Sequence, residues 1–301
     1  MLDFLLSNIG QGLIYAPIVL GVYITYSILD FPDLSVDGTF PLGAAISAIC
    51  LTAGIHPIFA ILLGMLAGAA AGFITGALHV YLRITNLLCG ILVMIGLYSI
   101  NLKIMGKANI PLLKVKTLYP SDAANGITKN LLFMLLISLL IVIVIKVLLD
   151  LYMRTFSGKA LLAVGASEQL VTTLSVNTGS LKIAGLMIAN GLTALSGALM
   201  AQYQRFADIG MGSGTVVIGL AAVIIGRAVF GRVRFIQGST SVIFGSIIYK
   251  VVVGIALKLG LDTDWMKLGT AVIFVLVIVL QRFITQRQQA AVVKKGGGAN
   301  A

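Results

Sequence analysis

Charged residues are scarce in this sequence. Asp, Glu, Lys and Arg together make up 10% of the 301 residues, hydrophobic residues make up 59%, and the mean hydropathy is +1.06. Soluble domains carry about 25% charged residues. The chain therefore has too little polar surface for a soluble fold, and we expect a lipid bilayer to be its solvent. The net charge of +11 would suggest nucleic acid for a soluble protein, but basic loops facing the cytoplasm account for it here, so no nucleic-acid partner is expected.

Residues and motifs for catalysis or metal binding are also lacking. The two cysteines, Cys50 and Cys89, lie in separate apolar stretches without a CxxC spacing, and the two histidines, His56 and His79, are isolated. We therefore expect no disulfide and no metal site. The sequence contains no G-x-x-x-x-G-K-[ST] phosphate loop, no G-x-S-x-G and no H-E-x-x-H. An enzyme is not expected, and any energy source for transport would lie on another subunit.

Long apolar runs are what the sequence does contain. Runs of about 17–25 residues predict membrane-spanning helices, because backbone groups in lipid have to be bonded within their own segment. The expected fold is an all-α polytopic membrane protein with about nine spans, of which the second and seventh are short and either intact, broken or re-entrant. The nine runs lie at roughly 9–29, 38–54, 57–80, 87–105, 131–151, 183–203, 213–230, 236–257 and 267–283.

Lysine and arginine indicate an orientation with the N-terminus outside. With that choice the inside segments carry more Lys and Arg than the outside segments, as the positive-inside rule requires. Two features oppose it: the lysine-rich loop at 103–130 would be external, and the acidic segment "DFPDLSVDG" would be internal.

Two polar segments resemble one another. "DLSVDGTFPLGAAISA" begins at Asp33 and "DIGMGSGTVVIGLAAV" begins at Asp208; each starts with Asp, passes through small residues and enters an apolar run. Spans 1–4 and 6–9 would then be inverted repeats with span 5 between them, an arrangement typical of transporters with a pathway between the halves. The alternative is that glycine-rich entries to spans are generally alike.

Polar residues near the spans are candidates for that pathway. Their alternative role is hydrogen bonding between helices. The candidates are Asp33, Ser35, Asp37, Phe40, Asn86, Asn190 and Gln202.

Four glycines form a smooth stripe, because they are spaced four residues apart: Gly64, Gly68, Gly72 and Gly76. The stripe predicts close helix packing within one subunit, with a dimer seam as the alternative.

The longest polar interruption is "GKALLAVGASEQLVTTLSVNTGSLK", from Gly158 to Lys182. We predict a short helix at about 167–176, with Ser167 as N-cap and Glu168 in its first turn. Leu170, Val171 and Leu174 would form one apolar face, suited to a groove on a partner. Gly165 would close the preceding run, and Asn177 with Gly179 would end the helix. The alternative is an ordinary interfacial loop.

Two stretches carry a family resemblance. "AVGASEQLVTTLSVNTGSLKIAGLMIANGLTALSGALMAQ" (163–202) resembles the cytoplasmic loop and following span of permease subunits in ABC importers of the branched-chain amino acid and simple-sugar permease family. Gly165, Val176 and Asn177 match its pattern, whereas Ser167 and Ser175 depart from it. "GLIYAPIVLGVYITYSILDFPDLSVDGTFPLGA" (12–44) resembles the first span and the entry to the second, in the form found in a subgroup linked to tryptophan and tyrosine.

The resemblance implies an importer of two permeases and two ATPases, fed by an extracytoplasmic substrate-binding protein in the bacterial cytoplasmic (inner) membrane. Residues 1–285 would form the permease domain and 286–301 a disordered cytoplasmic tail. ATP and Mg²⁺ would be bound by the ATPase, and a second copy of this chain would complete a homodimer. The substrate would be a small solute, an aromatic or branched-chain amino acid; the alternative function is a stand-alone channel or secondary carrier. The ATPase-coupling residues would be Gly165, Ser167, Glu168, Leu170, Val171, Leu174 and Asn177.

Overall fold

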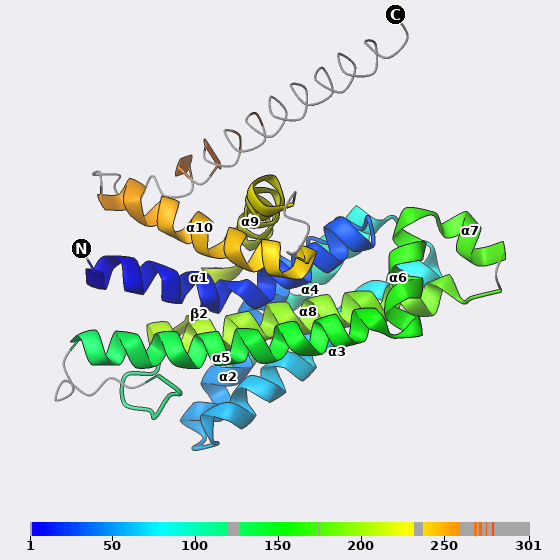
Figure 1. Cartoon of the computed structure of the whole chain (residues 1–301). Coiled ribbons are helices and arrows are strands. Elements are labelled where there is room, and N and C mark those ends of the chain that lie inside the picture. The colour runs from blue at the N-terminus through cyan, green and yellow to red at the C-terminus, as the bar shows by residue number, and fades with distance from the viewer. Residues whose placement is uncertain are drawn as a thin grey trace, which may run out of the picture.

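The computed structural model describes residues 2–119, 127–173, 175–231 and 237–258, together with isolated positions between 268 and 279. Over these residues the chain is a bundle of helices with one two-stranded antiparallel ribbon (Figure 1). The helices are α1 (Leu2–Val22) continuing into the π-helical turn η1 (Tyr23–Ile28), α2 (Val36–Thr52), α3 (Pro57–Leu82), α4 (Asn86–Met105), α5 (Ile127–Arg154), α6 (Phe156–Ala166), α7 (Glu168–Thr173), α8 (Thr178–Gln204), the 3₁₀ turn η3 (Ile209–Gly212), α9 (Thr215–Phe230) and α10 (Gly238–Lys258). The strands are β1 (Asn109–Pro111) and β2 (Phe206–Asp208).

Seven helices of the described residues are long and apolar enough to cross a membrane. They correspond to the first and the third to eighth of the nine predicted spans. The second predicted span is the 17-residue helix α2, which is at the short end of the range for a crossing and is not one of these seven. The ninth, 267–283, lies outside the described residues except for isolated positions, as does the tail at 286–301.

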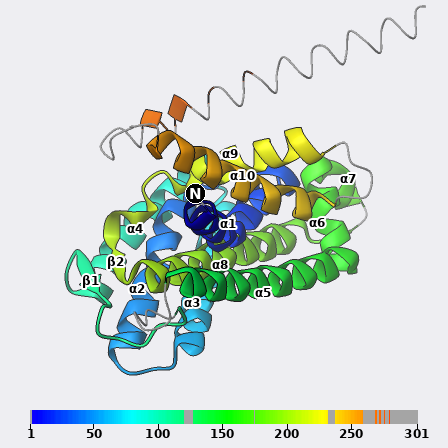
Figure 2. The ribbon, with the colours of Figure 1, turned by 60° about the vertical axis from the view of Figure 1, so that its left-hand side comes forward.

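Helix α8 lies at the centre of the bundle. Of its most apolar 18-residue stretch, 83% is buried in the protein. It packs against α1, α2 and α3, and Figure 2 shows α1 nearly end-on between α10 and α8. The glycine stripe of α3 faces α8: a Cβ at Gly68 would stand 2.5 Å from the Asn190 carbonyl oxygen, and one at Gly76 would stand 2.9 Å from the Ile183 Cα. The stripe is therefore filled by a helix of the same subunit.

The segment before α2 differs from its sequence-based prediction. The acidic "DFPDLSVDG" was expected in an internal loop, but Asp33 is only 4% exposed and Ser35 is fully buried between helices. The backbone from 29 to 35 is non-helical and then enters α2. Such backbone is tolerated at membrane depth when protein surrounds it and supplies its hydrogen bonds. Asp33 is therefore enclosed by the protein, whereas Asp30 of the same segment is exposed.

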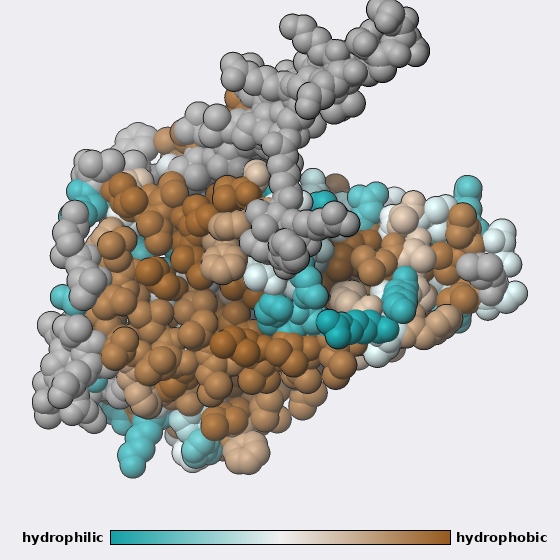
Figure 3. All heavy atoms as spheres, viewed as in Figure 1, coloured by the Kyte–Doolittle hydropathy of each residue, from teal (hydrophilic) through white to brown (hydrophobic). Residues whose placement is uncertain are grey.

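The outer surface is apolar over most of its length. Helix α5 is the most exposed of the seven long helices, since only 17% of its most apolar 18-residue stretch is buried. Its side chains that are more than half exposed include Leu136, Leu140 and Leu148. Figure 3 shows the apolar surface over α5 and α10, with hydrophilic residues more frequent toward the end that carries α6 and α7. In water these side chains would be costly to expose, so this face is suited to lipid or to another membrane helix.

Candidate functional site

The polar interruption forms two helices instead of one. The eleven-residue α6 precedes the six-residue α7, and Ser167 stands between them in an extended conformation with φ −162° and ψ 103°. The Ser167 hydroxyl accepts a hydrogen bond from the backbone N–H of Leu170 at 3.4 Å, the role expected of an N-cap. The predicted helix at 167–176 is therefore present in a shorter form, Glu168–Thr173. Leu174 lies outside the described residues.

Asn177 was expected to end this helix, and that expectation is wrong. The Asn177 side-chain oxygen accepts a hydrogen bond from the Ser180 N–H at 3.1 Å, so Asn177 begins α8, and Gly179 lies in the first turn of α8. Ser175, with φ 57°, makes the left-handed turn between the two helices. An Asn side chain can terminate one helix or start the next, and here the oxygen is used for the second.

The apolar face of α7 is divided between two directions. Leu170 is 61% exposed, whereas Val171 is 2% exposed and packs into the protein. Val171 therefore anchors α7, and Leu170 is the large apolar side chain that α7 presents outward among its described residues. Gly165 lies in α6 against the carbonyl oxygen of Ile28, where a Cβ would overlap it, so Gly165 permits α6 to contact the end of η1.

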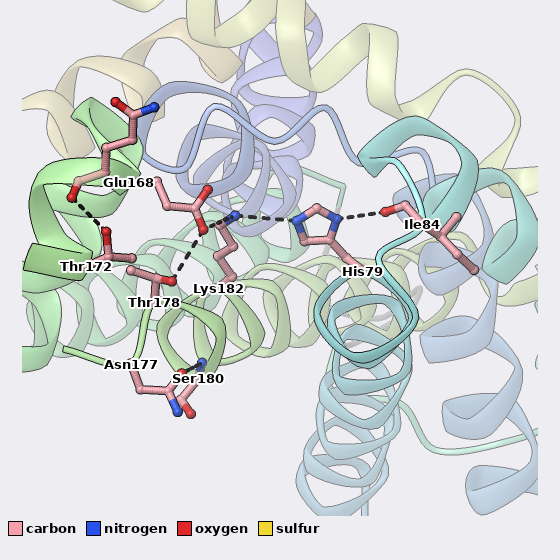
Figure 4. Close-up of polar contacts among 9 residues, drawn as sticks. His79, Ile84, Glu168, Thr172, Asn177, Thr178, Ser180 and Lys182 are labelled. Carbon is pink, nitrogen blue, oxygen red and sulfur yellow. Dashed lines mark hydrogen bonds and ion pairs between the residues drawn. The ribbon is translucent and has the colours of Figure 1, made fainter. Parts of the chain in front are cut away.

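A chain of polar contacts joins α7 to α8 and α3 (Figure 4). The Lys182 ammonium lies 2.8 Å from the Glu168 Oε1 and 3.4 Å from the His79 Nε2. Because an ammonium can only donate, Nε2 of His79 accepts, and Nδ1 therefore carries the proton donated to the Ile84 carbonyl oxygen at 2.8 Å. The hydrogen bond from Lys182 lowers the pKa of Glu168. These contacts connect α7 through Lys182 to α8 and to the turn between α3 and α4.

Asn190 of α8 is the centre of a second, fully buried network. Its Nδ2 donates to Asp33 Oδ2 at 2.8 Å, and its Oδ1 accepts from the hydroxyls of Ser35 at 3.1 Å and Thr39 at 2.8 Å. Asp33 Oδ1 also accepts from the Ser35 N–H at 2.8 Å. The contacts are those of the alternative role, hydrogen bonding between helices; a part in the pathway stays a prediction for Asp33, Ser35 and Asn190.

Asp37 joins the beginnings of α2 and α9. It lies in the first turn of α2, and its carboxylate accepts hydrogen bonds from the Gly214 N–H at 3.0 Å, the Thr215 hydroxyl at 2.9 Å and the Val216 N–H at 2.9 Å. A carboxylate in this position satisfies the free N–H groups of α9 and interacts favourably with its dipole. The two segments that resemble each other in sequence therefore meet at Asp37.

The remaining predicted pathway residues are scattered. Phe40 is fully buried and stacks on Tyr15 with ring centroids 5.8 Å apart. Gln202 is buried, accepting from the Leu118 N–H and donating to the Ser47 hydroxyl. Asn86 begins α4 and is partly exposed. These residues are therefore not brought together at one site.

A cavity of about 570 Å³ lies beside Asp37 and is lined by none of the other six predicted pathway residues. Its wall includes Tyr98, Ser99 and Asn101 of α4, which were not among the sequence-based candidates. The available signal was "YSIN", a polar run inside an apolar span.

Comparison with known proteins adds to this geometry. Residues 4–280 match the family described as the permease component of the branched-chain amino acid transport system. The chain belongs to this permease family. The family resemblance inferred from the sequence is therefore confirmed, and the permease is a multi-pass membrane protein.

Two individual relatives carry the name of a transport permease, and a third is uncharacterized. A tyrosine transport system permease protein of Clostridioides difficile (strain R20291) is 46% identical over 271 residues, covering 90% of this chain and 89% of that protein. The autoinducer 2 import system permease protein LsrC of Yersinia enterocolitica is 28% identical over 217 residues, covering 72% of this chain and 57% of that protein. An uncharacterized protein of Rickettsia prowazekii is 35% identical over 272 residues, covering 89% of this chain and 94% of that protein. No solved structure matches the permease.

Proposed function

We propose that this permease is the membrane subunit of an ATP-driven importer for an aromatic amino acid. A separate ATPase subunit binds ATP and Mg²⁺, so the chain itself is not an enzyme. An extracytoplasmic binding protein delivers the substrate, and the complex lies in the bacterial inner membrane with a second copy of this chain. The substrate class rests on the 46% identity to the tyrosine transport system permease protein.

The observation that carries the proposal is the construction of α7. It is a short helix with Leu170 outward, and it is held by an ion pair to Lys182 of α8, the most buried span. A partner that displaces α7 would act on the adjoining end of α8 through this contact. Because packed helices have discrete arrangements, such a displacement selects between two packings of the spans.

The proposal includes two inverted repeats among nine spans. Supporting this, Asp33 and Asp208 each accept a hydrogen bond from the N–H two residues later, at 2.8 Å from Ser35 and 2.7 Å from Gly210. Each of these turns leads into a short segment, and the segments meet at Asp37. Transporters built from inverted repeats bind substrate where such interrupted helices meet.

The test is capture of an ABC ATPase subunit by membranes that contain this chain. We expect Leu170→Asp, alone and combined with Leu174→Asp, to weaken capture by about tenfold or more, because a charge replaces a central apolar anchor. The control is Leu113→Asp, since Leu113 is 74% exposed and follows the ribbon at the opposite end of α8. Capture by the control variant should equal that of the unchanged protein.

Two outcomes would contradict the proposal. Undiminished capture by Leu170→Asp would remove α7 as the docking element. Flux of labelled L-tyrosine into liposomes that contain this chain alone, without ATP, would instead identify a stand-alone channel or carrier.

A further inference from the structure

The cavity beside Asp37 lies where the first turn of α2 meets η3, with α4 as its outer wall. Its volume of about 570 Å³ falls within the usual range for small-molecule sites, about 300–1,000 Å³. It is therefore large enough for an amino acid.

Asn101 lines this cavity and carries an unpaired acceptor. The residue is fully buried, and its Nδ2 donates to the Gly38 carbonyl oxygen at 3.1 Å. Its Oδ1 has no hydrogen-bond partner among the described residues. By contrast, the amides of Asn190 and Gln202 use both oxygen and nitrogen. A buried amide oxygen left unpaired is rare and requires an explanation.

The cavity has a second acceptor in Asp37. Two of the three hydrogen bonds to its carboxylate reach Oδ1 and one reaches Oδ2, so Oδ2 retains capacity for another donor. The described lining residues include no Lys, Arg or His. Acceptors without a matching cation favour a ligand that carries a donor-rich cationic group.

The rest of the wall is mainly apolar. Pro41, Met94, Ile95 and the ring of Tyr98 line it, and Tyr98 is 56% exposed. Met and Tyr side chains contact aromatic rings favourably, through sulfur–ring and ring–ring contacts. The wall therefore suits a flat apolar group next to the acceptor end.

We propose that this cavity is a binding site for a zwitterionic aromatic amino acid during its passage, with Asn101 Oδ1 and Asp37 Oδ2 receiving the α-ammonium group. The substrate class rests on the proposed function. The position of the site and its preference for an ammonium group rest on the cavity's two acceptors and on the lack of Lys, Arg and His among its described lining residues. A lipid headgroup amine has the same cationic chemistry, and the experiment separates the two sources.

The test is protection of a cysteine placed in the wall. Ser99 is exposed and lines the cavity, so Ser99→Cys, in a chain carrying Cys50→Ser and Cys89→Ser, is labelled with a small maleimide in nanodiscs free of phosphatidylethanolamine. L-tyrosine and tyramine should slow labelling by the factor 1 + [L]/Kd, about threefold at twice the dissociation constant. 3-(4-Hydroxyphenyl)propionate, which lacks the ammonium, should not protect.

Two further variants test the acceptor. Asn101→Leu should abolish protection while the unprotected labelling rate stays the same, and Asn101→Asp, which keeps an acceptor, should retain protection. A cysteine at exposed Thr52, at the far end of α2, is the control site and should be insensitive to tyrosine.

Three results would overturn the proposal: no protection by L-tyrosine, equal protection by the propionate, or protection by phosphatidylethanolamine to which tyrosine adds nothing. The assay contains no ATPase, so its failure is distinguishable from a failure of ATPase capture at α7.

Discussion

At the scale of single residues, three buried amides have three different environments. Asn190 and Gln202 are candidates from the sequence because they interrupt apolar runs, and in both the amide oxygen and the amide nitrogen are hydrogen-bonded inside the protein. Asn101 interrupts an apolar run equally well, yet only the structure shows that its oxygen is unpaired. The residue type identifies a polar group in a span. Only the hydrogen-bond geometry shows whether its polar atoms are already paired within the protein or are unpaired and able to bind a ligand.

Replacement of Asn190 is expected to be strongly destabilising. Asn190→Leu leaves the Asp33 carboxylate buried without its 2.8 Å donor, which should lower the free energy of unfolding by about 3 kcal/mol. Thermal unfolding in detergent measures the effect.

Thr193→Val provides the matched control one turn away on α8. The Thr193 hydroxyl donates to the Ala189 carbonyl of its own helix, so its removal should cost less than about 1 kcal/mol. Equal stabilities of the two variants would show that the Asp33–Asn190 contact contributes little.

At the scale of elements, α7 is held mainly by one buried side chain and one ion pair. Val171 anchors its inner face and Glu168 contacts Lys182. Glu168 is 49% exposed, so solvent screens the pair and the expected contribution is less than about 1 kcal/mol. Such a helix can be displaced by a partner without disruption of the bundle.

The attachment of α7 should depend on pH. Because the pKa of Glu168 is lowered from 4.5, the pair stabilises the attachment above pH 4.5, and this contribution is lost as the pH falls through the lowered pKa. At pH 7, Glu168→Gln should increase hydrogen exchange of the α7 amides by about threefold relative to the unchanged protein. This ratio should approach one in acid.

Gln169→Ala, at an exposed neighbouring position, serves as the comparison and should leave exchange at pH 7 unchanged. If Glu168→Gln exchanges like the unchanged protein at pH 7, the ion pair does not hold α7.

The contact between α3 and α8 should be sensitive to one methyl group. A Cβ at Gly72 would overlap the Leu186 carbonyl oxygen and stand 2.9 Å from the Asn190 Cβ. Gly72→Ala should therefore lower the free energy of unfolding by about 1–3 kcal/mol, although alanine has the higher helix propensity. Thermal unfolding in detergent measures the change.

Gly191→Ala, on α8 in the same helix pair, is the control. A Cβ there would stand 3.4 Å from the Met65 carbonyl oxygen, an ordinary contact, so stability should be unchanged or slightly higher. A Gly72→Ala protein as stable as Gly191→Ala would mean that the helices separate without cost.

At the scale of the whole molecule, the length of the apolar runs predicted an all-helical membrane protein and the positions of its long helices. Seven of the predicted spans correspond to long apolar helices, since a run such as 57–80 has few competing structures in lipid. The sequence did not predict the burial of Asp33 and Ser35, the division of 156–173 into two helices, or the β1–β2 ribbon. Each of these depends on contacts between residues far apart in the chain, such as Asp33 with Asn190, which a local pattern does not contain.

The carboxylate of Asp37 has a consequence for biosynthesis. Its three donors come from positions 177 to 179 residues later in the chain. At a synthesis rate of about 5–20 residues per second, α2 is made roughly 10–40 s before α9 exists. During that interval the carboxylate needs water or a proton, because an unpaired charge in lipid is costly. The hydrogen bonds that join the start of α2 to the start of α9 therefore form only after α9 has been made, and the cavity beside Asp37 gains its η3 wall late in synthesis.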